Sequence, residues 1–213
     1  MNITNECNME LMSRYEDNHF DLAIVDPPYG IDADKKNSAK KLQSKKSAGL
    51  SKDYGNQKWD SDIPNDEYFA ELKRVSKRQV VWGANFFNLQ GGMLFWHKHV
   101  TMPTYSQGEL AWLSWLNKVD FVSIAWHGMI QHDMKNKEIR IHPTQKPVKL
   151  YEWLLMNYAK EGDKILDTHL GSGSIALACH NLGYDLTACE LDKEYYNAAM
   201  ERIERHKQQL TMF

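Results

Sequence analysis

The fold is decided by residues 164–190, which read KILDTHLGSGSIALACHNLGYDLTACE. Alternating apolar and turn-forming stretches predict strand, glycine loop, helix, strand and closing acid, in the order Lys164 to Asp167, 168–174, Ile175 to Leu182, Leu186 to Cys189 and Glu190. Glycines at a helix N-terminus let the backbone approach a ligand closely, and the closing acid can accept hydrogen bonds from ribose hydroxyls. This order is typical of a nucleotide-binding βαβ unit.

Helices are predicted on both sides of this unit. Upstream, the segment His142-Pro143-Thr144-Gln145-Lys146-Pro147 opens a helix whose apolar residues recur at helical spacing. Downstream, Asp192 has the character of an N-cap for a final helix that directs Tyr196, Ala199 and Ile203 inward.

A second decisive stretch, Asp26-Pro27-Pro28-Tyr29-Gly30, follows the apolar run Leu22 to Val25. The run predicts a buried strand, and two prolines without N–H donors make the following turn stiff. The turn presents a carboxylate, bare carbonyls and a planar aromatic, a set that suits an exocyclic amino group beside a flat ring. The alternative is an ordinary turn at a strand end, where Asp, Pro and Gly are common.

The N-terminal and middle regions alternate in the same way. A short strand over 2–6 and a helix over 9–15 precede the Asp26 strand, and a helix begins near Pro64-Asn65-Asp66 with Phe69, Leu72 and Val75 on one face. Gln79 to Gly83 and Met93 to Trp96 predict buried strands, whereas 110–115 and 121–126 fit two strands or a strand and a short helix. Most of the tryptophans are expected in the core, although one or two could stack on an unpaired base.

A basic loop at about 31–58 interrupts this pattern. Between residues 35 and 52 it contains no acidic residue and seven lysines: Lys35, Lys36, Lys40, Lys41, Lys45, Lys46 and Lys52. Clustered lysines can bind a phosphate backbone without reading sequence. The alternative is a solvated, flexible insertion.

Composition narrows the class of protein. A chain of 213 residues that is 42% hydrophobic fits a single domain, 1–213, and no apolar run is long enough to span a membrane. The polar N-terminus does not resemble a signal peptide. Three cysteines without a C-x-x-C spacing predict neither disulfides nor a zinc site, so a cytoplasmic location is expected. The net charge of −2 gives no global sign of a polyanionic partner.

Together these motifs resemble a known family. The sequence Asp26-Pro27-Pro28-Tyr29 is similar to the catalytic motif of amino-group (N6-adenine and N4-cytosine) DNA methyltransferases, and residues 142–147 and 167–174 are similar to that family's cofactor region. The catalytic motif comes first and the glycine loop near the C-terminus, as in the permuted β group. The similarity covers about residues 1–30 and 141–205 and is diffuse between them.

The resemblance implies an α/β, Rossmann-like fold in which a mostly parallel seven-stranded sheet, with helices on both faces, binds S-adenosylmethionine at its carboxyl edge. The residues that it implies for the cofactor are Glu6 and Cys7 beside the adenine, Glu190 on the ribose, Asp167, Gly171 and Gly173 around the methionine, and Thr144 and Lys146 closing the pocket; Asp26, His169 and Ser172 are expected as further cofactor contacts. Thr168 and His169 depart from the family, which usually has Pro and Phe there. We expect His169 to contact the cofactor; a structural role and weakened binding are the alternatives.

The resemblance also implies a reaction. The Asp26 carboxylate and the Pro27 carbonyl would accept the two amine hydrogens of a flipped base, Pro28 would stiffen the turn and Tyr29 would stack on the base. No metal is required. Adenine N6 is favoured over cytosine N4 because cytosine members more often have Ser at the position of Asp26. RNA or protein-amide methylation, or a catalytically dead binding module, are the alternatives.

The predicted partner is DNA, without a membrane. A small candidate target-recognition region lies within about 97–140. Because this region is short for its task, a short recognition site or a homodimer whose second subunit helps is compatible with the sequence.

Overall fold

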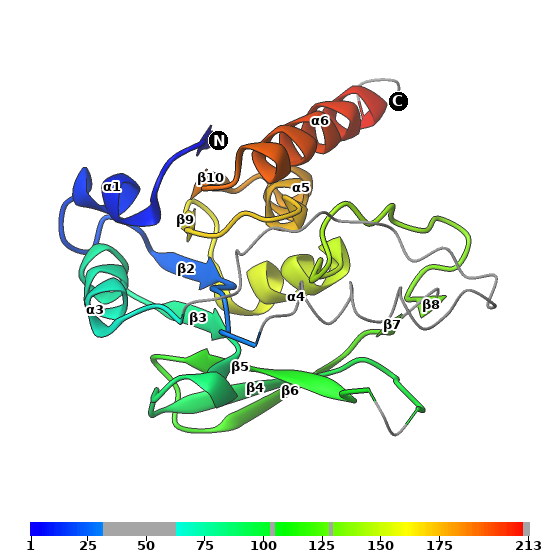
Figure 1. Cartoon of the computed structure of the whole chain (residues 1–213), viewed down its shortest axis with the longest axis horizontal. Helices are drawn as coiled ribbons and strands as arrows, with labels where there is room; N and C mark the ends of the chain where they lie inside the picture. The colour runs from blue at the N-terminus through cyan, green and yellow to red at the C-terminus, as the bar shows by residue number, and fades with distance from the viewer. Residues whose placement is uncertain (32–62, 103–104, 128–129, 211–213) are drawn as a thin grey trace.

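The computed structural model describes residues 1–31, 63–102, 105–127 and 130–210, and one large β-sheet forms its centre (Figure 1). The sheet has eight strands, and every described strand in it runs parallel to the others except β5. Across the sheet the order is β1 (Asn2–Thr4), β10 (Asp185–Cys189), β9 (Lys164–Asp167), β2 (Leu22–Val25), β3 (Gln79–Trp82), β5 (Gly108–Leu113), β4 (Gly92–His97) and β6 (Val119–Ser123). The predicted α/β class with a mostly parallel sheet is confirmed.

The number of strands is eight, whereas the family resemblance implied seven. Both segments that the sequence left open between strand and helix are strands, and β5 and β6 pair with the two edges of β4. A short apolar run does not by itself distinguish a strand from a helix. Here both segments become strands because each of them pairs with one hydrogen-bonding edge of β4.

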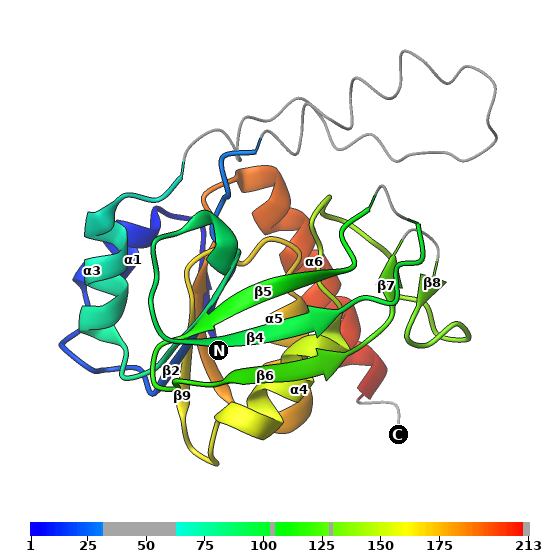
Figure 2. The ribbon, with the colours of Figure 1, turned by 90° about the horizontal axis from the view of Figure 1, so that it is seen from below.

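Helices cover both faces of the sheet, as Figure 2 shows from below. One face carries α4 (Val148–Tyr158), α5 (Ser174–Leu182) and α6 (Lys193–Leu210), and the other carries α1 (Asn8–Ser13) and α3 (Asp66–Val75). Each layer encloses its own apolar cluster with one face of the sheet. Because both faces of β2 and β3 are covered, all residues of these two strands are buried.

Two of the predicted helix starts are capped by side chains, and the cap at Asp192 was itself predicted. The Asn65 side chain accepts a hydrogen bond from the Tyr68 backbone N–H at 3.0 Å, and Asp192 Oδ1 accepts from the Tyr195 N–H at 3.0 Å. Of the residues predicted to point inward from α6, Ala199 and Ile203 are buried, and Tyr196 is half-buried with its hydroxyl 3.5 Å from the Ile3 carbonyl oxygen. The fully buried tyrosine of the helix is its neighbour Tyr195, which the sequence did not single out. Tyr195 is spaced by four residues from Ala199, the next buried position, and therefore lies on the same helix face.

The parallel strands end together at one edge of the sheet. β2 leads directly into Asp26, β10 into Glu190, and β9 ends with Asp167. Parallel pairing of β10 with β9, and of β9 with β2, places these three acidic residues along the same carboxyl edge. In open α/β sheets this edge is where ligands bind.

Two of the four described strands within the candidate target-recognition region, about 97–140, belong to the main sheet. β5 and β6 pair with β4, and the remaining described strands, β7 (Trp126–His127) and β8 (Ile130–Gln131), form a separate small hairpin. Within the described part of this region, the hairpin is the strand pair that lies outside the main sheet.

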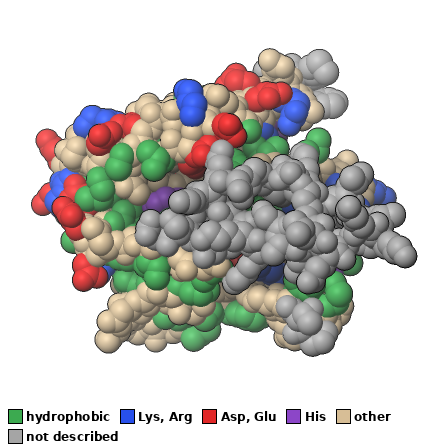
Figure 3. All heavy atoms as spheres, viewed as in Figure 1, with side chains coloured by type: hydrophobic (Ala, Val, Ile, Leu, Met, Phe, Trp, Pro, Cys, Tyr) green, Lys and Arg blue, Asp and Glu red, His purple; other side chains and the backbone are tan. Residues whose placement is uncertain are grey.

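The lysine-rich stretch between residues 35 and 52 lies outside the described residues. On the face in Figure 3, acidic and basic side chains of the described residues are interspersed over α1, α3 and α6. Among the helices that the structure describes, none has the length and apolar character needed to cross a membrane.

Candidate active site

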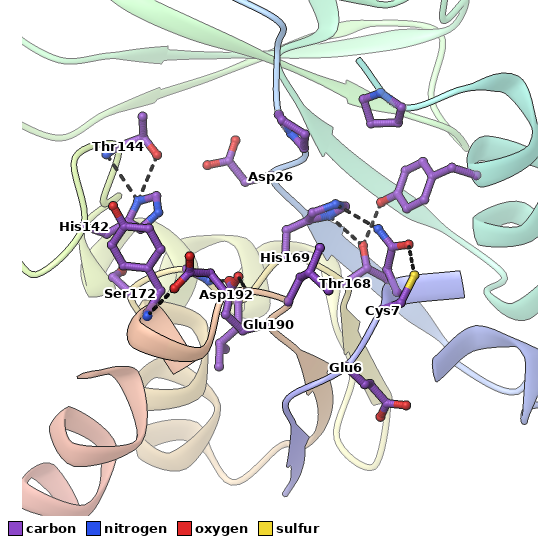
Figure 4. A pocket seen from close by; sticks show the side chains of 18 of the residues that line it. Glu6, Cys7, Asp26, His142, Thr144, Thr168, His169, Ser172, Glu190 and Asp192 are labelled. Atoms are coloured by element: carbon purple, nitrogen blue, oxygen red, sulfur yellow. Dashed lines mark hydrogen bonds between the residues drawn. The ribbon is translucent and has the colours of Figure 1, made fainter. Parts of the chain in front are cut away.

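A cleft of about 820 Å³ opens at the carboxyl edge of the parallel strands (Figure 4). Its walls come from segments that are distant in sequence. Some of these segments follow β1, β2, β9 and β10, and others lead into or begin α3, α4 and α6. The lining residues fall within 6–9, 26–28, 63–68, 142–151, 168–172 and 190–195. Its volume is in the range of small-molecule and cofactor sites.

The glycine loop and Glu190 form one end of the cleft. Glu190 Oε2 accepts a hydrogen bond from the Gly171 N–H at 2.8 Å, and Oε1 accepts from the Asp192 N–H at 2.9 Å. Burial raises the pKa of the Glu190 carboxyl, although these backbone donors oppose the shift. The carboxylate is held at a fixed orientation, and lone pairs remain on both oxygens for a ligand hydroxyl.

His169 belongs to a chain of polar side chains on the wall of the cleft. Tyr68 OH lies 2.7 Å from Thr168 Oγ1, which lies 3.0 Å from His169 Nδ1, and the Asn8 amide donates to His169 Nε2 at 3.0 Å. Burial lowers the pKa of His169 to about 4, so the neutral ring can accept from Asn8. Both ring nitrogens contact protein groups, and the imidazole can therefore meet a ligand only through its ring surface.

Glu6 lies at the cleft, but its carboxylate contacts Arg14. Arg14 donates to Oε2 at 2.5 Å and to Oε1 at 2.6 Å, and in Figure 4 the Glu6 carboxylate points away from Asp26 and His169. The hydrogen bonds from Arg14 lower the pKa of Glu6 to about 2. A polar contact between Glu6 and a ligand would compete with this bidentate pair. Its neighbour Cys7 also lines the cleft and is not part of an ion pair within the described structure.

The Asp26 carboxylate is engaged on both oxygens. The Tyr29 hydroxyl donates to Oδ1, and the Lys146 ammonium donates to Oδ2 at 2.5 Å. The Lys146 side chain is 3% exposed, and its Nζ also lies 3.2 Å from Glu109 Oε2. Burial alone would lower the pKa of Lys146, but the Asp26 and Glu109 carboxylates raise it. Lys146 therefore remains charged between two carboxylates.

The Tyr29 ring is held from outside the motif. It stacks on Phe86 with ring centroids 4.9 Å apart and an interplanar angle of 14°. Phe86 belongs to the 3-10 helix η1 (Ala84–Phe86), which follows β3. Packing against η1 thus sets the direction of the Tyr29 hydroxyl toward Asp26.

The structure brings most of the predicted site residues to the cleft. Those that line it are Glu6, Cys7, Asp26, Pro28, Thr144, Lys146, His169, Gly171, Ser172 and Glu190. Pro27, Tyr29, Asp167 and Gly173 lie outside the lining, with Asp167 buried beneath the loop at 2% exposure. The seven lysines of the basic stretch lie outside the described residues.

Several residues at the site carry no role in the sequence-based prediction. His142 and Tyr195 form one wall, with ring centroids 4.3 Å apart, and burial together with the Lys146 charge lowers the pKa of His142 to about 3. Asn65 was identified only as a helix start, and it also lines the cleft. For Glu109 the sequence contains a weak indication of a special role, because it is the one acidic residue in the otherwise uncharged strand GELAWL.

This fold and this site define a Rossmann-like α/β protein with a ligand cleft at the carboxyl edge of its sheet. A family model described as DNA methylase, covering N6 and N4 methyltransferases, matches residues 50–201. The chain belongs to this DNA methylase family, and the family resemblance inferred from the motifs is confirmed.

Similarity to an individual curated relative covers a shorter part of the chain than the family model does. The Type II methyltransferase M.HpaI of Haemophilus parainfluenzae is 39% identical over 69 residues, which cover 32% of this chain and 22% of the relative. The match therefore spans about a fifth of the length of that curated relative.

Solved structures agree with the fold across nearly the whole chain. M1.HpyAVI in its complex with SAM superimposes with a TM-score of 0.56 at 20% identity, covering 94% of this chain and 98% of that one. PvuII DNA methyltransferase, described as cytosine-N4-specific, gives a TM-score of 0.58 at 14% identity, covering 97% of this chain and 91% of that one. At these identities the agreement establishes the Rossmann-like fold of such methyltransferases.

Proposed function

We propose that this chain transfers a methyl group from S-adenosylmethionine to adenine N6 of a flipped base at specific sites in DNA. One observation carries the proposal. The Asp26-Pro27-Pro28-Tyr29 turn ends β2 beside the same cleft that is lined by the glycine loop and Glu190. The proposed acceptor of the amine hydrogens and the proposed nucleotide-binding loop therefore share one cleft.

The cleft fits the cofactor by size and by its polar groups. At about 820 Å³ it can hold a nucleoside-sized molecule. Glu190, oriented by two backbone N–H groups, is available to ribose hydroxyls. When bound, S-adenosylmethionine supplies an electrophilic methyl group on a positively charged sulfur. Family membership and the neighbouring M1.HpyAVI–SAM complex support this choice of cofactor.

The residues of the turn would prepare the amine. The exocyclic nitrogen is a poor nucleophile because its lone pair is delocalised into the ring. Hydrogen bonds to the Asp26 carboxylate and the Pro27 carbonyl would turn that lone pair out of the ring plane and stabilise developing positive charge. Phe86 covers one face of the Tyr29 ring and Lys146 Nζ lies 5.9 Å from the ring centroid, so a flipped base that stacks on Tyr29 would do so next to Lys146.

Adenine is proposed over cytosine on the identity of residue 26. Both bases present an exocyclic amine, and the fold is shared with an enzyme described as cytosine-N4-specific, so the fold does not discriminate. The resemblance associates a carboxylate at this position with adenine more often than with cytosine.

Mass spectrometry of nucleosides tests the proposal. DNA from cells expressing the wild-type chain should contain N6-methyladenine, and the Asp26→Ala variant should lower its rate of formation by at least about a hundredfold, the scale for losing an oriented catalytic group. Purified protein should be incubated in parallel with labelled cofactor and DNA, RNA or protein. Finding N4-methylcytosine without N6-methyladenine would show that the target base is cytosine. Label in RNA or protein but not in DNA would show that DNA is not the substrate. Cofactor binding without any methyl transfer would indicate a binding module.

The oligomeric state belongs to the same proposal, since a second subunit would help a chain with a small recognition region. β6 is the last strand of the described sheet, and Val119 and Phe121 on it are 72% and 60% exposed. We propose that a second copy packs on this apolar edge. Analytical ultracentrifugation should give a dimer for the wild type and a monomer for Phe121→Lys, and a wild-type monomer would exclude this arrangement.

A further inference from the structure

Four charged side chains of alternating sign form a row that leads from the end of β4, through β5, to the Asp26 turn. Lys98 pairs with Glu109 Oε1, Glu109 Oε2 lies 3.2 Å from Lys146 Nζ, and Lys146 pairs with Asp26 Oδ2. Glu109 lies on β5, the antiparallel strand, and it is not among the residues that line the cleft. It contacts the proposed catalytic group only through Lys146.

The ion pair between Lys146 and Asp26 conflicts with the proposed role of Asp26. A carboxylate that already accepts from an ammonium at 2.5 Å is a weaker acceptor for an incoming amine. The ammonium would also repel the positive charge that develops on the amine nitrogen. The arrangement in which Lys146 is bound to Asp26 is therefore the less reactive one.

Glu109 offers the lysine a second partner. Its Oε2 atom is buried, makes no hydrogen bond of good geometry within the described residues, and faces the same ammonium. Burial alone would raise the pKa of Glu109, but the charges of Lys146 and Lys98 lower it to about 2, so the carboxylate remains ionised. A small movement of the Lys146 amine would complete a hydrogen bond to Glu109 and release one oxygen of Asp26.

We propose that Glu109 is a positioning residue, which takes the ammonium of Lys146 from Asp26 when the amine of the base enters. This inference rests on the proposed function, because it concerns the same carboxylate. Lys98 holds the carboxylate of Glu109 from the other side and keeps Oε2 directed at Lys146. Removing the charge of Glu109 should leave Lys146 bound to Asp26 and slow methyl transfer without changing the cofactor site.

The test compares Glu109→Gln with the wild type in single-turnover methyl transfer to duplex DNA and in S-adenosylmethionine binding by calorimetry. We expect the single-turnover rate to fall at least about tenfold, which corresponds to 1.4 kcal/mol, while the cofactor Kd stays within about twofold. The matched control is Asp120→Asn, which removes the charge of a carboxylate on β6 that pairs with Lys118 and Tyr158 away from the cleft. That variant should keep the wild-type rate.

A double-variant cycle separates positioning from a purely structural role. If Glu109 acts through Lys146, Glu109→Gln should have no further effect on the rate in a Lys146→Met background. The same loss in both backgrounds, or a near-normal rate for Glu109→Gln alone, would overturn the inference. Should Glu109→Gln fail to fold, Glu109→Asp keeps the charge but shortens its reach to Lys146, and a rate unchanged by it would overturn the inference equally. A wild type that transfers no methyl group to any base would refute the proposed function and this inference together.

Discussion

At the scale of single residues, the position of the Tyr29 side chain depends on its close contact with the backbone of Gly83. A Cβ atom placed on Gly83 would lie 2.2 Å from Cε1 of Tyr29, and Gly83 has a φ of +77°. Only glycine leaves room for the Tyr29 ring at this point and tolerates this backbone conformation without strain. The hydroxyl that reaches Asp26 is therefore positioned partly by the absence of a side chain at the end of β3.

We predict that Gly83→Ala displaces the Tyr29 ring and lowers the methyl-transfer rate at least about tenfold while S-adenosylmethionine binding is retained. The matched control is Gly162→Ala, where φ is +84° but no atom lies within 4 Å of the added Cβ. Both variants should lose about 1–2 kcal/mol of stability from left-handed backbone strain. Equal activity in the two variants would show that the position of Tyr29 is unimportant for transfer.

Asp167 provides a prediction about pH. Burial, with added repulsion from Asp26 and Glu190, raises the pKa of its carboxyl to about 8, far above the value of about 3.8 expected when the chain is unfolded. Between these two values the folded protein binds more protons than the unfolded one, so this residue lowers stability as pH rises from about 4 to 8. Thermal unfolding without added cofactor should show this loss in the wild type and a flatter dependence in Asp167→Asn. Parallel pH profiles in the two proteins would contradict the assignment.

At the scale of elements, the loop between β9 and α5 shapes the cleft by its backbone. Gly171 has a φ of +53°, and a Cβ there would meet the ring of His142 only at 3.9 Å. Space next to Gly171 is thus open to the cleft, whereas a Cβ on Gly173 would meet Ile203 of α6 at 3.3 Å. The two glycines serve different purposes, one toward the ligand space and the other toward helix packing.

We predict that Gly171→Val places its side chain in the cleft and weakens S-adenosylmethionine binding by at least about a hundredfold, or 2.7 kcal/mol. Gly173→Ala is the control, because it adds a side chain in the same loop that contacts α6 instead. It should reduce the melting temperature more than the cofactor affinity. Calorimetry that gives both variants the wild-type affinity would remove the glycine loop from the cofactor site.

At the scale of the whole molecule, the cleft and the proposed DNA contact are adjacent in the chain. The described chain on either side of residues 32–62 comes close together: a Cβ on Gly30, next to the last described residue before this stretch, would lie 2.7 Å from Ile63 Cγ1. Ile63 and Pro64 also line the cleft. The chain therefore leaves and re-enters the described structure beside Asp26, and the lysines between residues 35 and 52 belong to the segment that starts there.

We predict that replacing these lysines by glutamine weakens binding about equally for all DNA sequences, because interactions with phosphates carry no sequence information. The slope of log K against log salt should become shallower by roughly 0.9 for each phosphate that the variant no longer neutralises. Binding isotherms at several salt concentrations measure this slope. A slope equal to that of the wild type would show that the lysines do not bind phosphates.

The sequence by itself determined the order and type of the elements that build the cleft. Periodicity and turn chemistry are local properties, so strands ending in Asp26, Asp167 and Glu190, and the cap at Asp192, could be placed without tertiary information. The sequence also predicted that these residues meet, because parallel strands end at one edge of a sheet, and most of the residues predicted for the cofactor do line one cleft. The number of strands and the burial of Tyr195 beside the predicted Tyr196 were not determined locally, since partner edges and helix rotation decide them.

Only the tertiary structure decided how the charges at the site are shared. Lys146 and Asp26 are 120 residues apart in the sequence, and Glu109 reaches the same ammonium from an antiparallel strand that the family motifs do not include. Ion pairs between distant segments depend on strand order and on the depth at which each side chain is buried. Neither quantity has a local signature in the sequence, because both arise when the sheet assembles and water is removed from the charged groups.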